Sequence, residues 1–363
     1  MHDYSRFIAP ERRSIPTPRN MVEGGKCVFG TFDREFETMD LLEIENPTSA
    51  PDFLKRLKLT VWEAAEVHLE HGVLLAACCD MGVFGQILNI FYDKRKKKVY
   101  SWAAKVPSKD AIVAGNLING SETRAAAKNL SIHYTNDFQD GKCYLQGWHE
   151  GEPGRIEYDF SLTRLSKPCV VSIPFADPAV RHRPLYSQKD FFQCSGWLKV
   201  NGETFYTTAA STAIVDDHKG YYPRKAHYDW VTTMGINESD GEKKWFAFNL
   251  TRNQSVDQER YNENLIWLEK ETSLLPPVQF IRDVPTLEFR DGARWFIRDE
   301  HDMVNVTFHV YDIFRMVTHA KPLINIEYFV AFGELEGYVR DESGRKYILD
   351  GMLGIGEDKT LLF

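Results

Sequence analysis

Alternation of apolar and polar residues with a period of two is the feature of this sequence that most restricts its fold. The pattern recurs in stretches rich in β-branched and aromatic residues: 128–135, 154–165, 190–200, 203–215, 304–310 and 324–339. Turn-forming dipeptides separate such stretches: Asp140-Gly141, Asn201-Gly202, Asp240-Gly241, Asp291-Gly292 and Ser343-Gly344. Strands joined by tight turns are typical of antiparallel barrels and sandwiches, so the sequence predicts an all-β chain.

Helical patterns are short and few. Residues 51–58, with Ser49 as the expected N-cap, form one, and residues 121–128 form a second. The chain is long enough for roughly twenty strands, which fit two successive barrels of about ten strands each. We therefore predict an N-terminal extension with a short helix at 1–59, a first barrel at 60–226 and a second barrel at 227–363.

Charge and composition limit the possible partners. The 363 residues are 43% hydrophobic, which is ample for a buried core, and carry a net charge of -8. An acidic surface repels nucleic acid and anionic membranes, so neither is expected as the main partner. The five basic residues at 94–98 lie between two strand-like stretches, where we expect a solvated hairpin turn.

The cysteines and the apolar runs bear on the compartment. None of the six cysteines has the paired spacing of a metal knuckle or a redox dithiol. Cys78 and Cys79 are adjacent in a strand-like run, so their side chains should point to opposite faces. No run approaches the roughly 20 apolar residues of an integral membrane span, and the amino terminus lacks the apolar core of a signal peptide. We expect a cytoplasmic protein with reduced thiols.

The densest group of chemically active residues lies at 216–230, at the boundary between the two predicted barrels. It contains Asp216, Asp217, His218, Lys219, Tyr221, Tyr222, Arg224, His227, Asp229 and Trp230. Carboxylates and imidazoles transfer protons, a guanidinium binds anions, and aromatic faces bind apolar or cationic groups. On a strand, His227 and Asp229 would share one face about 7 Å apart, with Trp230 on the other face.

These residues give a set of site candidates. Asp229, His227 and Asp217 are candidates for proton transfer, and a carboxyl that protonates an alkene must have its pKa raised by desolvation. The candidates for substrate binding are Tyr221, Tyr222, Arg224 and Trp230, together with Asp80 and Asn89, which flank a tight hairpin of the first barrel.

A structural interpretation of the same segment stays open. Asp216 to Gly220 can form a polar turn in which Gly220 takes a positive φ angle. Arg224 and Asp229 can form an ion pair, and Trp230 can fill the bottom of a barrel.

Several motifs resemble a bacterial family known as domain of unknown function 2804. They are Gly220-Tyr221-Tyr222-Pro223-Arg224 with Trp230, Asn249-Leu250, Glu263-Asn264, Trp267, the segment Val339-Arg340-Asp341-Glu342-Ser343-Gly344-Arg345, Leu349-Asp350-Gly351 and Gly354-Ile355-Gly356-Glu357-Asp358. Leu74 to Gly82 and Tyr100-Ser101-Trp102 fit the same family, so the resemblance spans nearly the whole chain.

That family is more distantly similar to carotenoid hydratases and tocopherol cyclases. The resemblance implies two tandem lipocalin-like barrels, a pocket near their junction, and protonation of a carbon-carbon double bond followed by capture of the cation by water or a phenol. The hydratases carry a Trp followed by acid, His and acid, whereas here His227 and Asp229 precede Trp230. No catalytic residue is therefore transferred from those relatives.

Three functions remain open at this point. The first is a cofactor-independent hydratase, cyclase or isomerase that acts on an apolar, isoprenoid-like molecule. The second is a carbohydrate-active enzyme that uses paired carboxylates beside aromatic platforms. The third is a carrier that binds a lipophilic ligand without converting it. We expect a small-molecule ligand, no cofactor and no metal, since His68 and His71 lack a third ligand nearby.

Overall fold

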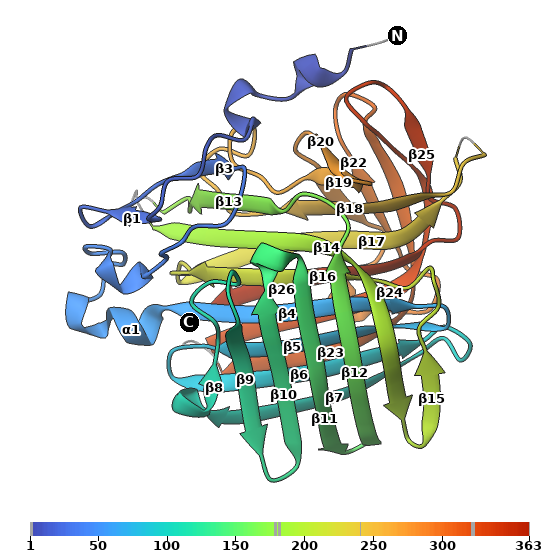
Figure 1. Ribbon diagram of the computed structural model, residues 1–363, viewed down its shortest axis with the longest axis horizontal. Coiled ribbons are helices and arrows are strands. Elements are labelled where there is room, and N and C mark those ends of the chain that lie inside the picture. The colour runs from blue at the N-terminus through green and yellow to red at the C-terminus, as the bar shows by residue number, and fades with distance from the viewer. Residues whose placement is uncertain (1–2, 178–179, 181–182, 240, 321–323, 363) are drawn as a thin grey trace. The chain divides into compact units, whose positions relative to one another are not determined.

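The computed structural model describes residues 3–177, 180, 183–239, 241–320 and 324–362 (Figure 1). Its strands pair antiparallel in two large sheets, which confirms the prediction of an all-β chain with two barrel-like sheets in tandem. The chain divides into two compact units. The N-terminal unit comprises Ser14–Phe91 and Tyr100–Tyr222, and the C-terminal unit comprises Met1–Arg13, Tyr92–Val99 and Pro223–Phe363.

The N-terminal unit is built on one long sheet with the strand order β7-β6-β5-β4-β16-β14-β12-β11-β10-β9-β8. Strands β8 and β9 return to contact β5, so the sheet curls around a single core. The bounds are β1 Val22–Glu23, β2 Lys26–Cys27, β3 Gly30–Phe32, β4 Thr60–Leu69, β5 Gly72–Asp80, β6 Phe84–Asp93, β7 Lys98–Pro107, β8 Ala111–Ile112, β9 Ser121–Ala127, β10 Leu130–Asp137, β11 Lys142–Gly151, β12 Gly154–Arg164, β13 Cys169–Pro174, β14 Pro184–Val200, β15 Glu203–Tyr206 and β16 Thr212–Gly220.

The C-terminal unit contains a second antiparallel sheet with the order β20-β19-β18-β17-β26-β24-β23-β22-β21. Its long hairpin of β23 and β24 has a register shift between Val310 and Asp312. The bounds are β17 Lys225–Asn237, β18 Lys244–Arg252, β19 Leu265–Leu268, β20 Glu271–Leu274, β21 Gln279–Arg282, β22 Arg294–Arg298, β23 Val304–Ala320, β24 Ile324–Arg340, β25 Lys346–Ile348 and β26 Leu353–Leu362.

Helical structure is limited to short turns. The only α-helix of the described part is α1 (Lys55–Lys58), and 3-10 turns occupy Ser5–Phe7, Pro10–Arg12, Leu41–Glu43, Asp52–Leu54, Ser108–Asp110, Phe138–Asp140 and Thr286–Glu288. Within the described residues, no helix is long and apolar enough to cross a membrane.

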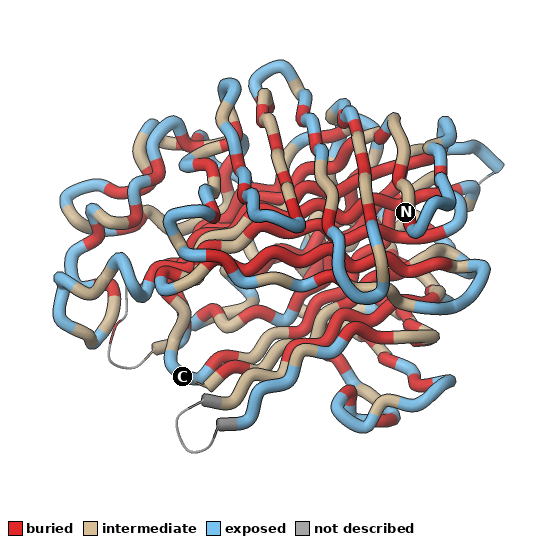
Figure 2. The backbone as a smooth tube through the Cα atoms, turned by 90° about the horizontal axis from the view of Figure 1, so that it is seen from below, coloured by how far each residue is buried: buried red, intermediate tan, exposed pale blue. Residues whose placement is uncertain are grey.

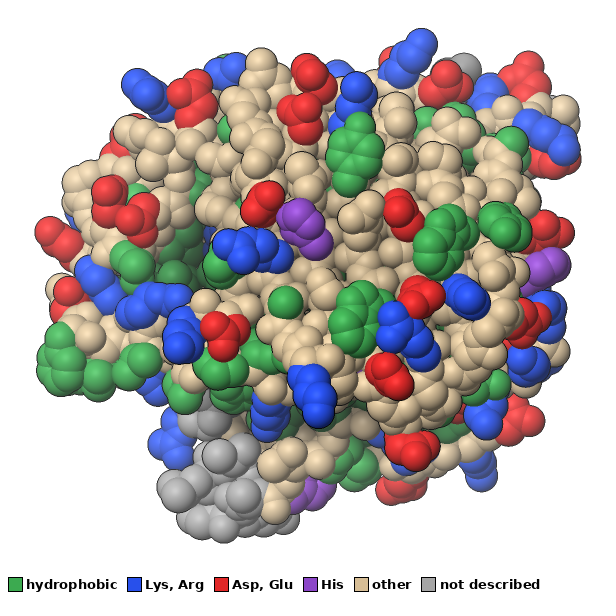
Figure 3. Space-filling view, turned by 60° about the horizontal axis from the view of Figure 1, so that its bottom comes forward, with side chains coloured by type: hydrophobic (Ala, Val, Ile, Leu, Met, Phe, Trp, Pro, Cys, Tyr) green, Lys and Arg blue, Asp and Glu red, His purple; other side chains and the backbone are tan. Residues whose placement is uncertain are grey.

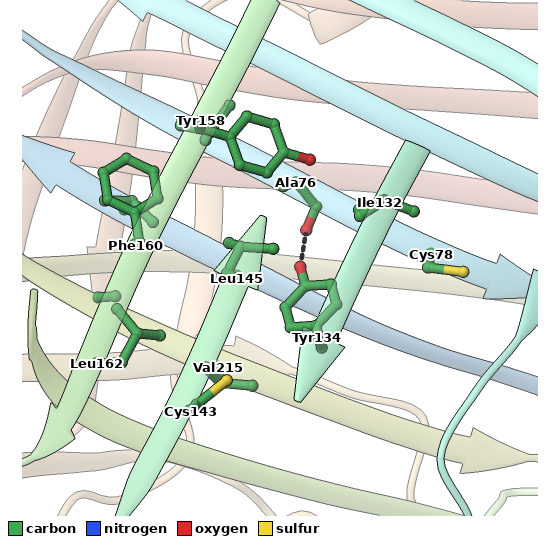
Figure 4. Close-up of a cluster of buried hydrophobic side chains, with 14 of the residues drawn as sticks. Ala76, Cys78, Ile132, Tyr134, Cys143, Leu145, Tyr158, Phe160, Leu162 and Val215 are labelled. Atoms are coloured by element: carbon green, nitrogen blue, oxygen red, sulfur yellow. Dashed lines mark hydrogen bonds between the residues drawn. The ribbon is translucent and has the colours of Figure 1, made fainter. Parts of the chain in front are cut away.

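The period of two sets which side chains fill the interior of the N-terminal unit. Ala65 and Val67 on β4 and Val215 on β16 enter one buried cluster with aromatic residues of β10 and β12. Figure 4 shows this cluster, in which the hydroxyl of Tyr134 donates to the carbonyl oxygen of Ala76 at 2.7 Å. Figure 2 shows the same arrangement along the backbone, with buried segments concentrated in the strands and exposed segments in the turns.

The core of the C-terminal unit is separate. Val231 on β17 packs with Phe248, Trp295 and Phe329 from other strands of its own sheet. The buried Arg12 belongs to this unit as well, because its guanidinium donates to the carbonyl oxygens of Asn264 and Leu275 at 3.0 and 3.1 Å. Residues near the start of the chain are thereby fixed to the segments on either side of the hairpin of β19 and β20.

Three local expectations are wrong. Residues 121–128 form strand β9 instead of a helix, because pairing with β10 outweighs the helix propensity of three consecutive alanines. The helical stretch at 51–58 exists as a 3-10 turn followed by α1, but Pro51 is its N-cap in place of Ser49. The stretch 203–215 is two strands, β15 and β16, joined by a turn.

The turn predictions are otherwise confirmed where the structure describes them. Residues 94–97 connect β6 to β7, and Arg95 and Lys96 bind the buried carboxylate of Asp93 in that turn. Asp240 lies outside the described residues. All six cysteines are free, and Cys78 enters the core while Cys79 lies on the opposite face of β5.

Candidate functional site

The segment 216–230 is divided between the two units. Residues up to Tyr222 end the N-terminal unit with β16, and residues from Pro223 begin the main part of the C-terminal unit with β17. Because successive side chains of a strand point to opposite faces, each of these strands contributes residues to two different environments. Each unit therefore has its own candidate residues.

Asp217 points into the interior of the N-terminal unit. Its carboxylate binds the ammonium group of Lys219, and it lies directly opposite Glu63 on the neighbouring strand β4. Burial raises the pKa of Asp217 in spite of this ion pair. Burial, with the charge of Asp217 as second cause, also raises the pKa of Glu63, to about 8. The interior of this barrel thus contains a carboxyl group that keeps its proton at neutral pH.

A second group of buried carboxyls lies next to the first. Arg164 binds Asp190 and Glu35 at 2.7 and 2.6 Å, and the amide of Gln188 donates to Asp190 at 2.7 Å. Burial raises the pKa of Asp190 to about 7, although the positive charge of Arg164 opposes the effect. Four acidic groups in this interior therefore face two cationic groups, Arg164 and Lys219.

The opposite face of β16 presents His218 and Asp216. Pairing with β14 places Ser187 beside His218 and Lys189 beside Asp216. The Nε2 atom of His218 lies 2.9 Å from each of three atoms, Asp216 Oδ1, Ser187 Oγ and Lys189 Nζ. We call these four residues the His218 cluster.

An aromatic surface adjoins the His218 cluster. Trp62 is the β4 residue opposite His218, and the two rings stack with centroids 4.6 Å apart and an angle of 12° between planes. Tyr222 stacks on Trp62 from further along the chain, with a centroid distance of 5.7 Å, and Phe175 contacts Tyr222. A proton-transferring group and aromatic faces thus lie together on one face of the sheet.

The charge state of Asp216 follows from its neighbours. Burial raises the pKa of Asp216, but the charges and hydrogen bonds of His218 and Lys189 outweigh this effect and hold the pKa below its ordinary value. Asp216 is therefore a carboxylate at neutral pH, and it compensates positive charge on its two basic neighbours.

Strand β17 carries the second candidate group. His227 and Asp229 lie on one face, as predicted, with His227 Nε2 3.2 Å from Asp229 Oδ2. The hydroxyl of Thr360 lies 2.9 Å from His227 Nδ1. The imidazole is half-buried with 37% of its side chain exposed, whereas Asp229 is buried.

The pKa of Asp229 lies below its ordinary value in this setting. Burial raises its pKa, but hydrogen bonds and charges from His227 and Arg282 together lower the pKa below the ordinary value. The guanidinium of Arg282 lies 2.6 Å from Asp229 and 3.4 Å from Asp358. A role as proton donor requires that desolvation raise the pKa of Asp229, and here the ion pairs outweigh that effect.

The same cluster has metal-binding residue types. One ligand atom each from His227, Asp229 and Asp358 lies within 4.8 Å of the others. The guanidinium of Arg282 already supplies the positive charge that two of these carboxylates require. The donor set does not fit a resident metal ion, because a cation there would be repelled by Arg282.

The remaining predicted binding residues have structural contacts. Tyr221 is buried and donates its hydroxyl to Leu41 O at 3.0 Å. The carboxylate of Asp80 accepts from Arg56, Ser108 and the backbone N–H of Gly82 at 2.6 to 2.9 Å. Asn89 accepts from Tyr158 at 2.7 Å inside the barrel.

Trp230 and Arg224 differ in their surroundings. The indole N–H of Trp230 donates to Asn249 Oδ1 at 2.6 Å, and the amide of Asn249 donates to Glu263 O at 2.8 Å. Trp230 therefore joins three of the motif segments in one unit. Arg224 is exposed, and Asp229 forms its ion pair with Arg282 instead of Arg224, which the structural interpretation had allowed as its partner.

Gly220 does not have the positive φ angle expected of a turn residue. It is the last residue of β16, and a Cβ atom there would lie 2.9 Å from Pro184 O. Glycine is therefore required by the close approach of β14.

Several residues of these clusters have no signal in the sequence. Trp62, Ser187 and Lys189 join His218 only through the register of β4, β16 and β14. Arg282 reaches Asp229 from a strand that begins 50 residues after it. Ser187 and Lys189 are two residues apart on β14, so the period of two places them on the same face. The sequence does not show which strand pairs with β14 at that point.

The family model for domain of unknown function DUF2804 matches residues 12–363. The chain therefore belongs to the DUF2804 family, as the sequence motifs predicted. No curated protein matches the sequence.

Two solved structures are distantly similar. One is kievitone hydratase from Nectria haematococca, at 12% identity and a TM-score of 0.48, covering 84% of this chain and 88% of the other. The other is a protein assigned as AttH from Nitrosomonas europaea, also at 12% identity and a TM-score of 0.48, covering 83% of this chain and 92% of the other. At this level of similarity neither protein bears on the activity of this chain.

Proposed function

We propose that this member of the DUF2804 family is a cofactor-independent acid–base enzyme of the hydratase, cyclase or isomerase type. Its substrate is a small apolar molecule with a carbon-carbon double bond. The observation that supports the proposal most is the stack of His218 on Trp62, with Asp216 and Lys189 at the Nε2 atom of the same imidazole.

The proposal follows from what alkene protonation requires. A donor must give a proton to one carbon, and the resulting cation must be stabilised until a nucleophile reaches the other carbon. The imidazole of His218, with Asp216 and Lys189 at its Nε2 atom, is the group that supplies the proton. The ring faces of Trp62 and Tyr222 stabilise the cation.

The proton balance distinguishes the three reaction types. In hydration, water adds its oxygen to the cation and returns a proton to His218, so one water is consumed and the enzyme is unchanged. In cyclisation, a hydroxyl of the substrate replaces water. In isomerisation, the cation loses a proton from an adjacent carbon. Asp216, which stays ionised, balances the charge of the imidazolium in each case.

His227 and Asp229 are a second candidate pair for the same chemistry. The ionised Asp229 orients the imidazole, and the half-exposed ring is accessible. Its two ring nitrogens lie within hydrogen-bond distance of Asp229 and Thr360. Among the described residues no aromatic ring stacks on this imidazole, whereas Trp62 stacks on His218, so we rank this pair below the His218 cluster.

Glycoside hydrolysis has less support. It requires two carboxyl groups on either side of one bond, one of them protonated. Asp216 and Asp217 are adjacent but lie on opposite faces of β16, and Asp229 is held ionised. Glu63 and Asp217 do lie opposite each other with Glu63 protonated, but both side chains are fully buried and Asp217 is bound to Lys219.

The test is turnover of apolar isoprenoid alkenes by the purified chain in ¹⁸O-labelled or deuterated water, followed by mass spectrometry. A hydratase incorporates ¹⁸O, a cyclase or isomerase incorporates deuterium only, and a carrier returns its ligand unchanged. We expect His218→Gln and Asp216→Asn to lower the rate by roughly 10² to 10⁴-fold.

A matched control comes from the exposed pair His309 and Glu336, whose side chains lie 2.8 Å apart in the C-terminal unit. His309→Gln removes an imidazole of the same kind and is expected to leave turnover unchanged. Full turnover in His218→Gln with loss in His227→Gln would transfer the assignment to the second pair. Full turnover in both variants would refute the proposal.

A further inference from the structure

One end of the N-terminal unit exposes large apolar side chains close together. Phe53 is 82% exposed, Val83 69% and Leu57 48%. Phe53 and Leu57 are four residues apart in one short helical segment made of the 3-10 turn Asp52–Leu54 and α1. We call Phe53, Leu57 and Val83 the apolar patch.

Local packing holds the three residues together. The turn after β5 contacts the end of α1, because a Cβ atom added to Gly82 would lie 2.6 Å from Leu57 O. The buried carboxylate of Asp80 ties the same parts together, since it accepts from Arg56 of α1, from the N–H of Gly82 and from Ser108. The backbone turn that carries Val83 is therefore fixed against the end of the helix that carries Leu57.

Basic side chains surround the apolar patch. Lys55, Arg56 and Lys58 lie on α1 itself, where Lys55 pairs with Asp52, Arg56 pairs with the buried Asp80, and Lys58 is exposed. Lys109 follows Ser108, which is bound to Asp80, and Lys105 lies over the ring of Phe84 next to Val83. In Figure 3 hydrophobic and basic side chains lie side by side at the left edge of the molecule, the side on which α1 lies in Figure 1.

The size of the patch indicates the kind of partner. A stable protein interface buries about 1,200 Å² or more, which three side chains on one helical turn and one loop do not provide. A lipid surface needs no matching shape, accepts isolated apolar side chains and attracts lysine and arginine when its headgroups are anionic.

We propose that this end of the N-terminal unit docks on an anionic lipid bilayer. Phe53, Leu57 and Val83 enter the boundary between headgroups and acyl chains, and the lysines around them contact the headgroups. The net charge of -8 opposes approach of the protein in other orientations, so the contact is confined to this end. The inference does not depend on the chemistry of the His218 cluster.

The test is flotation of the full chain with vesicles of phosphatidylcholine alone or mixed with phosphatidylglycerol. We expect binding only to the mixed vesicles, with affinity that falls as salt is added. Phe53→Ser should weaken this binding roughly tenfold, because it removes one exposed aromatic ring that the bilayer would bury. Lys58→Gln and Lys109→Gln should each weaken it roughly fivefold, because both lysines are exposed.

Tyr206→Ser is the matched control. Tyr206 on β15 is 72% exposed and lies outside the apolar patch, so its loss should leave vesicle binding unchanged. Absence of binding to the mixed vesicles would overturn the inference. An equal loss in Tyr206→Ser and Phe53→Ser would also overturn it. A change of oligomeric state in Phe53→Ser, measured by light scattering, with vesicle binding intact would assign the patch to a second copy of the chain instead.

Discussion

Replacement of Glu63 by glutamine tests the buried carboxyl of the N-terminal unit. The folded protein holds a proton on Glu63 up to about pH 8, whereas the unfolded chain releases it near the ordinary pKa of 4.5. Between these values the folded state binds one more proton than the unfolded state, so the free energy of unfolding falls as pH rises. The stabilisation is fully present below 4.5 and is lost as pH approaches about 8.

The magnitude follows from the number of protons. One proton corresponds to a slope of about 1.4 kcal/mol per pH unit, or roughly 5 kcal/mol over the whole interval. Glutamine has nearly the same shape, can still accept from the amide of Asn136, and does not titrate. The difference in unfolding free energy between variant and wild type should therefore shift in favour of the variant as pH rises.

The assay is urea unfolding of both proteins at several values from about pH 5 to about pH 8 at constant salt. Because two units can unfold separately, hydrogen exchange of peptides from β4 and β16 should accompany it. Glu122→Gln removes an exposed carboxylate of β9 and serves as the control. Parallel curves for Glu63→Gln and wild type across this range would refute the reasoning.

Two further substitutions test interactions described above. Arg282→Met should lower the unfolding free energy of the C-terminal unit by about 3–5 kcal/mol, because it leaves the buried Asp229 without its guanidinium partner. Arg294→Met removes the exposed pair with Asp283 and serves as the control, for which denaturant unfolding should show a loss of less than about 1 kcal/mol. Tyr134→Phe should lower the midpoint of thermal unfolding, because the carbonyl oxygen of Ala76 loses its side-chain donor at a cost of about 1–3 kcal/mol. An unchanged midpoint would contradict the stabilising role of this hydrogen bond.

The sequence predicted what depends on neighbours along the chain. His227 and Asp229 share a face, and Trp230 lies on the other, because the period of two acts within a single strand. The hairpin turns and the all-β class follow from equally local signals. The prediction of a helix at 121–128 was wrong because three alanines favour a helix locally, whereas pairing with β10 depends on residues further along the chain.

Which residues meet in each candidate site depends on the register between neighbouring strands. Trp62 lies more than 150 residues before His218, and no local pattern relates the two. The alternation rule does place Asp216 and Asp217 on opposite faces of the strand. Residues 213–215 are apolar on both faces, however, so they do not indicate which face is interior. Glu63 lies opposite Asp217 only through the register of β4 and β16, which no local pattern shows.

The contact of Arg12 with Asn264 and Leu275 has a consequence for synthesis of the protein. Arg12 leaves the ribosome early, but the two carbonyl groups that it binds are made more than 250 residues later. The C-terminal unit therefore cannot form this contact until residues 264–275 have been translated, and the first segment must wait without its partners. A protein expressed without residues 1–13 should lose structure first in β19 and in the loop after β20, next to the carbonyl groups that Arg12 binds.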